Sequence, residues 1–260
     1  MKVVILCGGR GIRLSEEMEF RPKSMAPIGQ VPILCHLMKL YIHYGYTEFI
    51  LCLGSRGDAI KDFFLRFREF MYGFTLDMQN GMIVYHKDTN WDAILNAKIT
   101  FLDTGANAST GERIAQVESY VCSDEHFFLT YGDTLSDVRL DNLYAFHQAM
   151  GRIVTVTAAH PTTRLGVIEF GDGLATSFRE LEPQRSAVKG GFYVCSHHVF
   201  KYIQQHKPCV FESDVLPKLV QEQELAVFEH LGFWHLLESH KDLAQIEAMW
   251  DNGTAPWRVT

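Results

Sequence analysis

Short apolar runs that alternate with helix-spaced apolar residues constrain the fold of this 260-residue chain more than any other feature. Val3–Cys7, Phe49–Leu53 and Phe127–Tyr131 are continuous apolar runs of the kind found in strands buried on both faces. Residues 32–43 and 58–70 carry apolar side chains at helical spacing. Strands and helices that alternate in this way predict right-handed βαβ units. The expected fold is therefore α/β, with a mostly parallel sheet covered on both faces by helices.

The second half of the chain favours a smaller, β-rich part. Four shorter strands with alternating patterns are predicted there, at Val154–Ala158, Gly166–Phe170, Ala175–Phe178 and Gly190–Cys195. Helices are expected over residues 196–206, 212–221 and 238–249. In the first half, Gln79-Asn80-Gly81 lies between two apolar runs and predicts a hairpin, so we expect part of the sheet edge to be antiparallel and the sheet to be mixed. No repeat or linker divides the chain, which predicts one domain over residues 1–260.

Composition excludes several classes of protein. With 24 basic and 31 acidic residues the net charge is −7, which argues against a broad nucleic-acid-binding surface. The six cysteines show no C-x-x-C spacing and several lie in apolar runs, so they are expected to be buried, reduced thiols. No apolar stretch approaches the ~20 residues that cross a bilayer, and the N-terminus does not resemble a signal peptide. We therefore expect a cytoplasmic protein without a membrane partner.

A glycine-rich turn after the first strand is the strongest candidate for a ligand site. Gly8, Gly9 and Gly11 leave backbone N–H groups accessible to an anion, and Arg13 adds a charged fork suited to phosphate. Lys23, fixed by the preceding proline, suits the same phosphates, although an ordinary surface lysine is the alternative. A tight turn that needs glycine only for its backbone angles is the alternative for the loop. The loop lacks the Gly-Lys-Ser/Thr of a Walker motif, and Leu14 occupies the position of the third dinucleotide-motif glycine, which excludes both of those classes.

Further motifs extend along nearly the whole chain. They are Gly8-Gly9-x-Gly11-x-Arg13-Leu14, Arg21-Pro22-Lys23, Pro32-Ile33-Leu34-x-His36, Asp103-Thr104-Gly105, Thr110-Gly111-x-Arg113, Thr130-Tyr131-Gly132-Asp133, Gly190-Gly191-Phe192, Gly232-Phe233-Trp234 and Ala255-Pro256-Trp257. In combination they resemble the signature of the sugar-1-phosphate nucleotidyltransferases, and most closely the glucose-1-phosphate cytidylyltransferase branch. The resemblance implies a Rossmann-like nucleotidyltransferase fold. It also implies that residues 1–150 are mainly the nucleotide-binding half, and that residues 151–260 are mainly the acceptor-binding and C-terminal helical half.

The resemblance also implies a set of site residues. Arg13, Lys23 and Asp133 would be catalytic, and Asp133 with a late carboxylate, which aligns with Glu238, would hold Mg²⁺. The nucleotide-binding residues would be Leu6, Gly8, Gly9, Gly11, Arg13, Lys23, Thr110, Arg113, Gly132 and Asp133. Asp133 also fits on physical grounds, because ligand sites of open α/β sheets gather where apolar strands end. The alternative for Asp133 is a solvated aspartate in a turn, and the alternative for Arg113 is a residue on the surface of a helix. For Asp137 we favour a structural role, such as capping the following segment, over support of the metal site.

The implied reaction is attack by an acceptor phosphate oxygen on the α-phosphorus of CTP, which transfers CMP and releases pyrophosphate. The attacking group is already anionic, so no general base is needed and none of the 12 histidines is assigned that role. His197, His198 and His235 are expected to pack or to form hydrogen bonds. The family also implies homo-oligomers. The expected partners are thus CTP, Mg²⁺, a small phosphorylated acceptor and further copies of the chain.

Three departures from the family pattern concern the acceptor side. Leu181 stands where a lysine usually grips the acceptor phosphate, Lys189 replaces an asparagine, and Glu238 replaces an aspartate. Lys189, Arg179 or Arg185 are positioned in sequence to restore the missing charge, and the expected acceptor-binding residues are Lys189, Gly190, Arg179 and Arg113. Two hypotheses follow. One is an active cytidylyltransferase whose acceptor is a sugar 1-phosphate or a related phosphate or phosphonate; the other is a catalytically degraded, nucleotide-binding homologue that regulates or scaffolds a partner.

Overall fold

A seven-stranded mixed sheet forms the centre of the molecule. The computed structural model describes residues 1–9, 22–86, 91–160, 166–171, 174–180, 187–203 and 208–259, with backbone alone for 166–171 and 174–180. The sheet strands are β1 (Val3–Leu6), β4 (Glu48–Leu53), β7 (Lys98–Asp103), β8 (His126–Tyr131), β10 (Val154–Ala159), β13 (Val188–Ser196) and β14 (Leu225–His230). Their order is β14-β10-β13-β8-β1-β4-β7. Only β13 runs antiparallel to its neighbours in this sheet, which confirms the predicted mostly parallel α/β fold.

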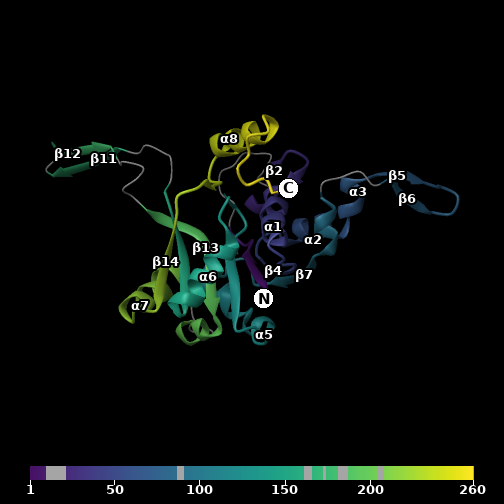
Figure 1. The fold of residues 1–260 in the computed structure, drawn as a ribbon. Helices are drawn as coiled ribbons and strands as arrows, with labels where there is room; N and C mark the ends of the chain where they lie inside the picture. Colours follow the sequence, from purple (N-terminus) through teal and green to yellow (C-terminus); the bar gives the residue numbers. More distant parts are fainter. Residues whose placement is uncertain are drawn as a thin grey trace.

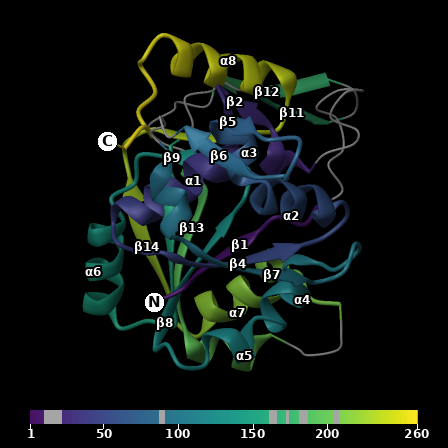
Figure 2. The same ribbon diagram turned by 90° about the vertical axis from the view of Figure 1, so that its right-hand side faces the viewer.

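Helices cover both faces of this sheet (Figures 1 and 2). One face carries α1 (Ile33–His43), α2 (Gly57–Leu65), α3 (Phe67–Met71) and α6 (Leu140–Met150), and the other carries α4 (Thr110–Ala115), α5 (Glu118–Val121), η4 (His197–Tyr202), η5 (Phe211–Val215) and α7 (Leu216–Gln221). Because successive side chains of a strand point to opposite faces, Val3 and Ile5 join the first core and Val4 and Leu6 the second. The continuous apolar run of β1 is explained by burial on both sides.

A third apolar cluster lies beyond the carboxyl ends of the strands. Its members come mainly from β2 (Pro27–Ile28), the first residue of α1, β9 (Thr134–Ser136), α8 (His240–Asp251) and the C-terminal segment, together with Ala26. Ala26 follows η2 (Lys23–Met25) directly, β3 (Val31–Pro32) pairs with β2, and β15 (Trp234–Leu236) pairs with β9. The helix predicted over 238–249 begins two residues later, because Ser239 is its N-cap and forms a capping box with Asp242. This cluster fixes the segment that carries Lys23 above the sheet.

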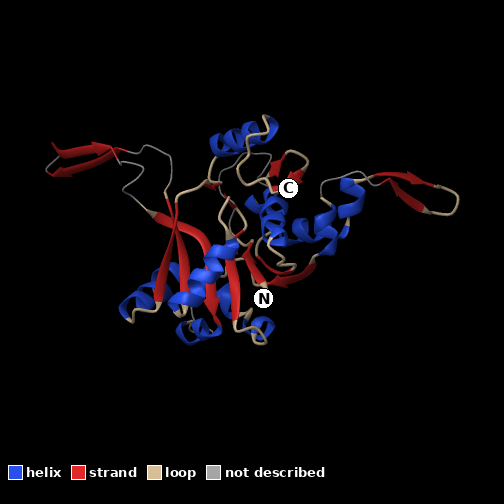
Figure 3. Ribbon diagram, in the orientation of Figure 1, coloured by secondary structure: helices blue, strands red, loops and turns tan. Residues whose placement is uncertain are grey.

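Two hairpins complete the fold (Figure 3). β5 (Gly73–Leu76) and β6 (Ile83–His86) form the hairpin predicted from Gln79-Asn80-Gly81, in which Gly81 has a φ of +72°. It is a separate two-stranded sheet rather than an antiparallel edge of the main sheet, so that part of the prediction was wrong. The antiparallel pairs of the main sheet come from β13 instead. β11 (Gly166–Gly171) pairs with β12 (Leu174–Glu180).

Other sequence expectations need smaller corrections. The helix expected over 58–70 is two helices that meet at Arg66, and the helix expected over 212–221 begins with a π-helical turn, η5. Residues 196–206 form a 3-10 helix over His197–Tyr202, and residues 204–207 lie outside the described part. All six cysteines are free, but Cys122 is exposed rather than buried. Within the described residues, no helix combines the length and apolar character needed to span a membrane.

Candidate functional site

The candidate site lies where the strand order reverses. From β1 the chain adds β4 and then β7 on one side, after which β8 pairs with the other side of β1. The loops that leave β1 and β8 therefore diverge at their carboxyl ends, where open α/β sheets bind ligands. Gly8 and Gly9 follow β1, and Gly132 and Asp133 follow β8. The topology thus brings together two segments that are more than a hundred residues apart in sequence.

A cleft of about 170 Å³ opens between these two loops. Its lining consists of Leu6, Cys7, Gly8, Gly9, Lys23, Ser24, Tyr131, Gly132 and Asp133. Six of these are residues that the sequence marked for nucleotide binding, namely Leu6, Gly8, Gly9, Lys23, Gly132 and Asp133. Gly11, Arg13 and Leu14 lie outside the described residues. The cleft has the backbone donors and the lysine that a phosphate chain requires.

Gly132 allows η2 to pack closely against the end of β8. A Cβ atom at this position would lie 2.9 Å from the Cβ atom of Ser24 and 3.3 Å from Sγ of Cys7. The backbone N–H of Gly132 also donates to the carbonyl oxygen of Leu6. Since Ser24 follows Lys23 directly, the missing side chain of Gly132 sets how near the Lys23 ammonium comes to Asp133.

Arg113 supports the glycine turn from inside the protein. Its side chain is 2% exposed, and its Nη1 donates to the carbonyl oxygen of Leu53 at 2.9 Å and to Oγ1 of Thr104 at 2.6 Å. A Cβ atom at Gly8 would lie 2.2 Å from Cζ of Arg113, so the guanidinium packs directly against the turn. The surface-residue alternative for Arg113 is therefore wrong. Its roles toward nucleotide and acceptor stay predictions, and the geometry gives it a positive charge beneath the phosphate cradle.

Asp133 is the centre of a small set of charges. Burial raises the pKa of its carboxyl above the ordinary aspartate value, the charge of Lys23 opposes this shift, and Glu238 adds to it. Lys189 also lowers the pKa of Asp133, though less than Lys23 does. The carbonyl oxygen of Asp133 accepts a hydrogen bond from the backbone of Leu237 at 2.9 Å, which places Glu238 next to it. Asp133 and Glu238, which the resemblance pairs, thus lie within electrostatic range of each other, although Glu238 is exposed and does not line the cleft.

This donor set fits a magnesium ion that is completed by substrate. Mg²⁺ prefers oxygen ligands and is commonly held by one or two carboxylates together with phosphate oxygens. The negative charges of Asp133 and Glu238 repel each other, and a cation bound between them would relieve this repulsion. The described residues contain no cluster of three or more histidine, cysteine, aspartate or glutamate side chains arranged to hold a metal by themselves. A metal at this site would therefore depend on the nucleotide for further ligands.

Glu212, which the sequence did not single out, organises the neighbouring side of the cleft. Oγ1 of Thr110 donates to its Oε2 at 2.6 Å, the hydroxyl of Tyr131 donates to Oε1, and Nζ of Lys189 lies 3.1 Å from Oε1. Burial raises the pKa of Glu212, but the two hydroxyl donors and Lys189 more than offset this and lower it. Glu212 is therefore a carboxylate. Sequence alone could not find it, because its partners are distant in sequence and belong to no common motif.

Lys189 and Gly190, which the sequence proposed for acceptor binding, lie near the start of β13. Nζ of Lys189 lies 5.2 Å from the centroid of the Tyr131 ring, and Tyr131 also lines the cleft. The carbonyl oxygen of Gly190 accepts a hydrogen bond of 2.6 Å from Nε1 of Trp234. Arg179 lies in β12, where its backbone pairs with Val167. The side chain of Arg179 is not described, and Leu181 and Arg185 lie outside the described residues.

Comparison with known proteins identifies the family. The family model described as "Nucleotidyl transferase" matches residues 2–253. The chain is 40% identical over 260 residues to a "Probable glucose-1-phosphate cytidylyltransferase" of Bacillus subtilis, and all of both chains is covered. It is 39% identical over 262 residues to a "Glucose-1-phosphate cytidylyltransferase" of Salmonella typhimurium, covering 100% of this chain and 99% of the relative. The chain belongs to the sugar-1-phosphate nucleotidyltransferase family.

Solved structures of nucleotidyltransferases share the fold. A putative glucose-1-phosphate thymidylyltransferase from Bacillus anthracis, in complex with a sucrose, aligns with a TM-score of 0.69 at 17% identity and covers 96% of this chain and 95% of its own. A UDP-glucose pyrophosphorylase complexed with UDP-glucose aligns with a TM-score of 0.67 at 14% identity and covers 97% and 98%. These identities are low, so the two structures speak for the Rossmann-like nucleotidyltransferase fold alone.

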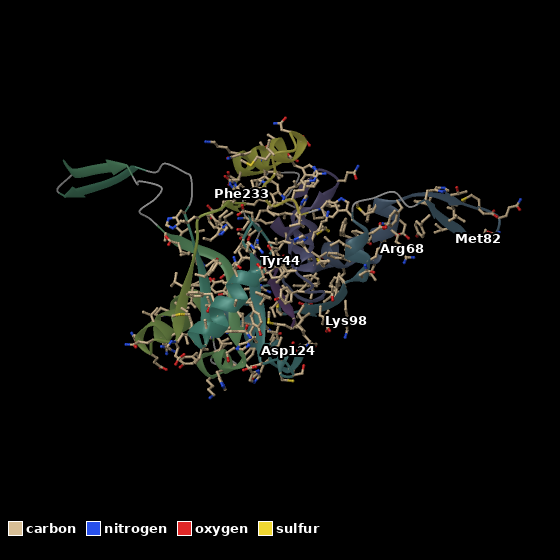
Figure 4. The ribbon with its side chains drawn as sticks, viewed as in Figure 1. Tyr44, Arg68, Met82, Lys98, Asp124 and Phe233 are labelled. Carbon is tan, nitrogen blue, oxygen red and sulfur yellow. The ribbon has the colours of Figure 1, made fainter. Side chains whose placement is uncertain are left out.

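The nucleotidyltransferase uses its remaining polar groups near the site for structure. Oδ1 of Asp137 lies 3.1 Å from Nε2 of His230, and the backbone N–H of Asp137 donates to the carbonyl oxygen of Phe233, labelled in Figure 4. This supports the structural interpretation of Asp137. Nε2 of His235 lies 3.6 Å from the α8 capping residue Asp242. His235 therefore has an acidic neighbour in the capping box of α8.

Proposed function

We propose that this nucleotidyltransferase transfers CMP from CTP to a phosphate-bearing acceptor and releases pyrophosphate in a Mg²⁺-dependent reaction. The observation that carries the proposal is the convergence of the Gly8–Gly9 backbone, Lys23 and Asp133 at the switch point of the sheet. CTP as the donor rests on the two relatives that are 39–40% identical over the full length, both named as glucose-1-phosphate cytidylyltransferases. We also propose that the enzyme is cytoplasmic.

The chemistry needs alignment more than it needs proton transfer. An acceptor phosphate oxygen forms the new bond to the α-phosphorus of CTP, and the bond between the α-phosphorus and the bridging oxygen to the β-phosphorus breaks. The leaving pyrophosphate keeps that electron pair, so no base is required. Lys23 and the Gly8–Gly9 backbone hold and neutralise the triphosphate, while Arg113 adds charge below the turn. A metal held by Asp133 and Glu238 would supply charge neutralisation between the two polyanions.

Lys189 is the proposed anchor of the acceptor anion. In the free protein it pairs with Glu212 and lies over Tyr131, so it is already placed beside the cleft. It is half-exposed, which leaves it free to turn toward an incoming phosphate. The proposed acceptor is a sugar 1-phosphate or a related phosphate or phosphonate. Lys189 would thereby replace the positive charge of the family lysine whose position Leu181 occupies.

A pyrophosphate-release assay tests the function directly. Four nucleoside triphosphates are crossed with a panel of sugar phosphates, phosphonates and phosphorylated amino acids, with and without Mg²⁺. Turnover that requires CTP and Mg²⁺ is expected for at least one acceptor. Measurable CTP binding with no turnover across the panel would instead favour the second hypothesis, a catalytically degraded homologue with a regulatory or scaffolding role. The family departures at Leu181 and Glu238 support that hypothesis.

We further propose that the enzyme is a homo-oligomer that uses the β5–β6 hairpin as a contact. The hairpin projects from the body of the molecule, and Met82 lies at its outer part (Figures 1 and 4). Its exposed apolar side chains are Phe74, Leu76, Met78, Met82, Ile83 and Val84. An isolated two-stranded hairpin is marginally stable in water, and exposed apolar patches usually mark contacts. A second copy of the chain would cover it.

A further inference from the structure

A second cavity, of about 440 Å³, lies away from the catalytic cleft. It is formed by the C-terminal part of α1, the helical turn η3 (Asp92–Asn96) with the residue before it, the end of α8 and the C-terminal segment, which returns beside α1 in Figures 1 and 2. None of its lining residues also lines the cleft. Its size falls in the range of small-molecule sites. We call it the tryptophan pocket, after Trp91 and Trp250.

The two indole rings of the pocket are held in place by the core beneath them. Their centroids are 6.1 Å apart, and the ring of His36 packs edge-on against both, at 4.9 Å from Trp91 and 4.5 Å from Trp250. His36 is buried, its Nε2 lies 3.0 Å from the carbonyl oxygen of Ile28, and burial lowers its pKa to about 4. Trp250 also packs against Gly29, where a Cβ atom would lie 2.3 Å from Nε1. The aromatic walls are therefore pre-formed.

Two cations meet in this pocket, and none of the carboxylates that the structure describes pairs with either of them. Nζ of Lys39 lies 5.2 Å from the centroid of the Trp91 ring, and Cζ of Arg258 lies 5.1 Å from that of Trp250. Burial, and then the charge of Arg258, lower the pKa of Lys39. Among the described residues, no carboxylate forms an ion pair with either cation. Within the described part of the chain no carboxylate offsets this repulsion, and an anionic ligand would relieve it.

We propose that the tryptophan pocket binds a small planar anion that carries a dianionic group, such as an aromatic phosphate. Its ring would pack against the two indoles, and its phosphate would bridge Lys39 and Arg258. A phosphate without the ring would leave the indoles unused, and a ring without the phosphate would leave the two cations unpaired. The site is distinct from the proposed catalytic cleft, and the inference does not rest on the proposed function.

Isothermal titration calorimetry with phenyl phosphate tests the proposal on the full-length protein. Phenyl phosphate is expected to bind once per chain, and inorganic phosphate and phenol each at least about tenfold more weakly. Binding is expected to persist in Lys23→Gln, which weakens the catalytic cleft. It should also change the tryptophan fluorescence, and Trp250→Phe should reduce that change. Cytidine monophosphate is titrated in parallel to distinguish a nucleotide from other aromatic phosphates as the natural source.

A pair of charge variants locates the site. Lys39→Gln/Arg258→Gln is expected to weaken phenyl phosphate binding by about tenfold or more, because two charge-assisted contacts are lost. The matched control is Arg66→Gln/Lys98→Gln, which removes the same charge from exposed positions elsewhere and should bind normally. Nucleotidyl transfer is expected to be unchanged in both proteins.

Several results would overturn the proposal. If phenyl phosphate does not bind, or if it binds equally well to the Lys39→Gln/Arg258→Gln protein, then the pocket is not a site for such a ligand. Inorganic phosphate that binds as tightly as phenyl phosphate would show that the indoles take no part. If Lys39→Gln/Arg258→Gln dissociates an oligomer, and neither this variant nor the wild-type protein binds phenyl phosphate, the pocket is a contact between copies of the chain.

Discussion

Asp133 carries the sharpest prediction at the scale of single residues. Because burial raises its pKa in the folded state, its contribution to stability is complete below the ordinary aspartate pKa of about 3.9 and is lost as pH rises through the folded value. We therefore expect Asp133→Asn to raise the free energy of unfolding at pH 7 and to leave it unchanged near pH 3. Urea unfolding at both pH values measures this. The same variant should lower nucleotidyl transfer by at least about a hundredfold.

Glu238 supplies the contrast to Asp133. If the late carboxylate is a required metal ligand, Glu238→Ala should raise the Mg²⁺ concentration needed for half-maximal rate, and Glu238→Gln should do so less. Glu247→Ala, which removes a carboxylate farther along α8, is the control. Loss of activity in Asp133→Ala with full activity at unchanged Mg²⁺ in Glu238→Ala would show that Glu238 is not a necessary ligand.

Lys189 gives a further prediction at the scale of single residues. Lys189→Ala is expected to raise the KM for the acceptor by about tenfold to a hundredfold with a smaller change in the KM for CTP, because the lost charge is the one proposed to hold the acceptor anion. Lys201→Ala, on η4, is the control. Steady-state kinetics with each substrate varied in turn measure the effect. An unchanged KM for glucose 1-phosphate in the Lys189→Ala enzyme would contradict the assigned role.

At the scale of elements, Gly132 controls how η2 meets β8. Gly132→Ala would bring its Cβ to 2.9 Å from Ser24, so η2 must shift and carry Lys23 with it. A displacement of this order can cost about a hundredfold in rate, and we expect kcat/KM for CTP to fall by about tenfold to a hundredfold. Gly73→Ala, where a Cβ meets open space, should be neutral. Equal activity of the two variants would show that the close packing is not needed.

The same elements show what sequence could and could not predict. The apolar runs of β1, β4 and β8 identify their strands because burial on both faces favours apolar side chains at nearly every position. Their order in the sheet follows from side-by-side pairing, which no local pattern encodes. The placement of Gly8 and Gly132 on one cleft follows from the same pairing. Arg113 illustrates the limit: it follows an ordinary helix start in sequence, yet the fold buries its guanidinium beneath Gly8. Glu212 was missed for the same reason.

At the scale of the whole molecule, the β5–β6 hairpin is the proposed contact between copies of the chain. Met78 and Met82 lie in the turn region between its strands and are 83% and 58% exposed, so charging them leaves the strand pairing intact. We expect Met78→Glu/Met82→Glu to convert the native oligomer to smaller species. In the proposed oligomer a second copy covers both methionines, so each would become a desolvated carboxylate. Size-exclusion chromatography with light scattering measures this, and circular dichroism checks that the fold is retained.

The control for the hairpin places the same charges on exposed apolar residues elsewhere. Leu65→Glu/Val220→Glu alters the ends of α2 and α7, whose side chains are also largely exposed, and should leave the mass unchanged. A wild-type protein that is monomeric at the concentrations of the assay would contradict the proposed assembly outright. An oligomer that survives the methionine substitutions would instead move the contact to another surface, because six apolar side chains cannot hold an interface whose two most exposed members carry unpaired charge.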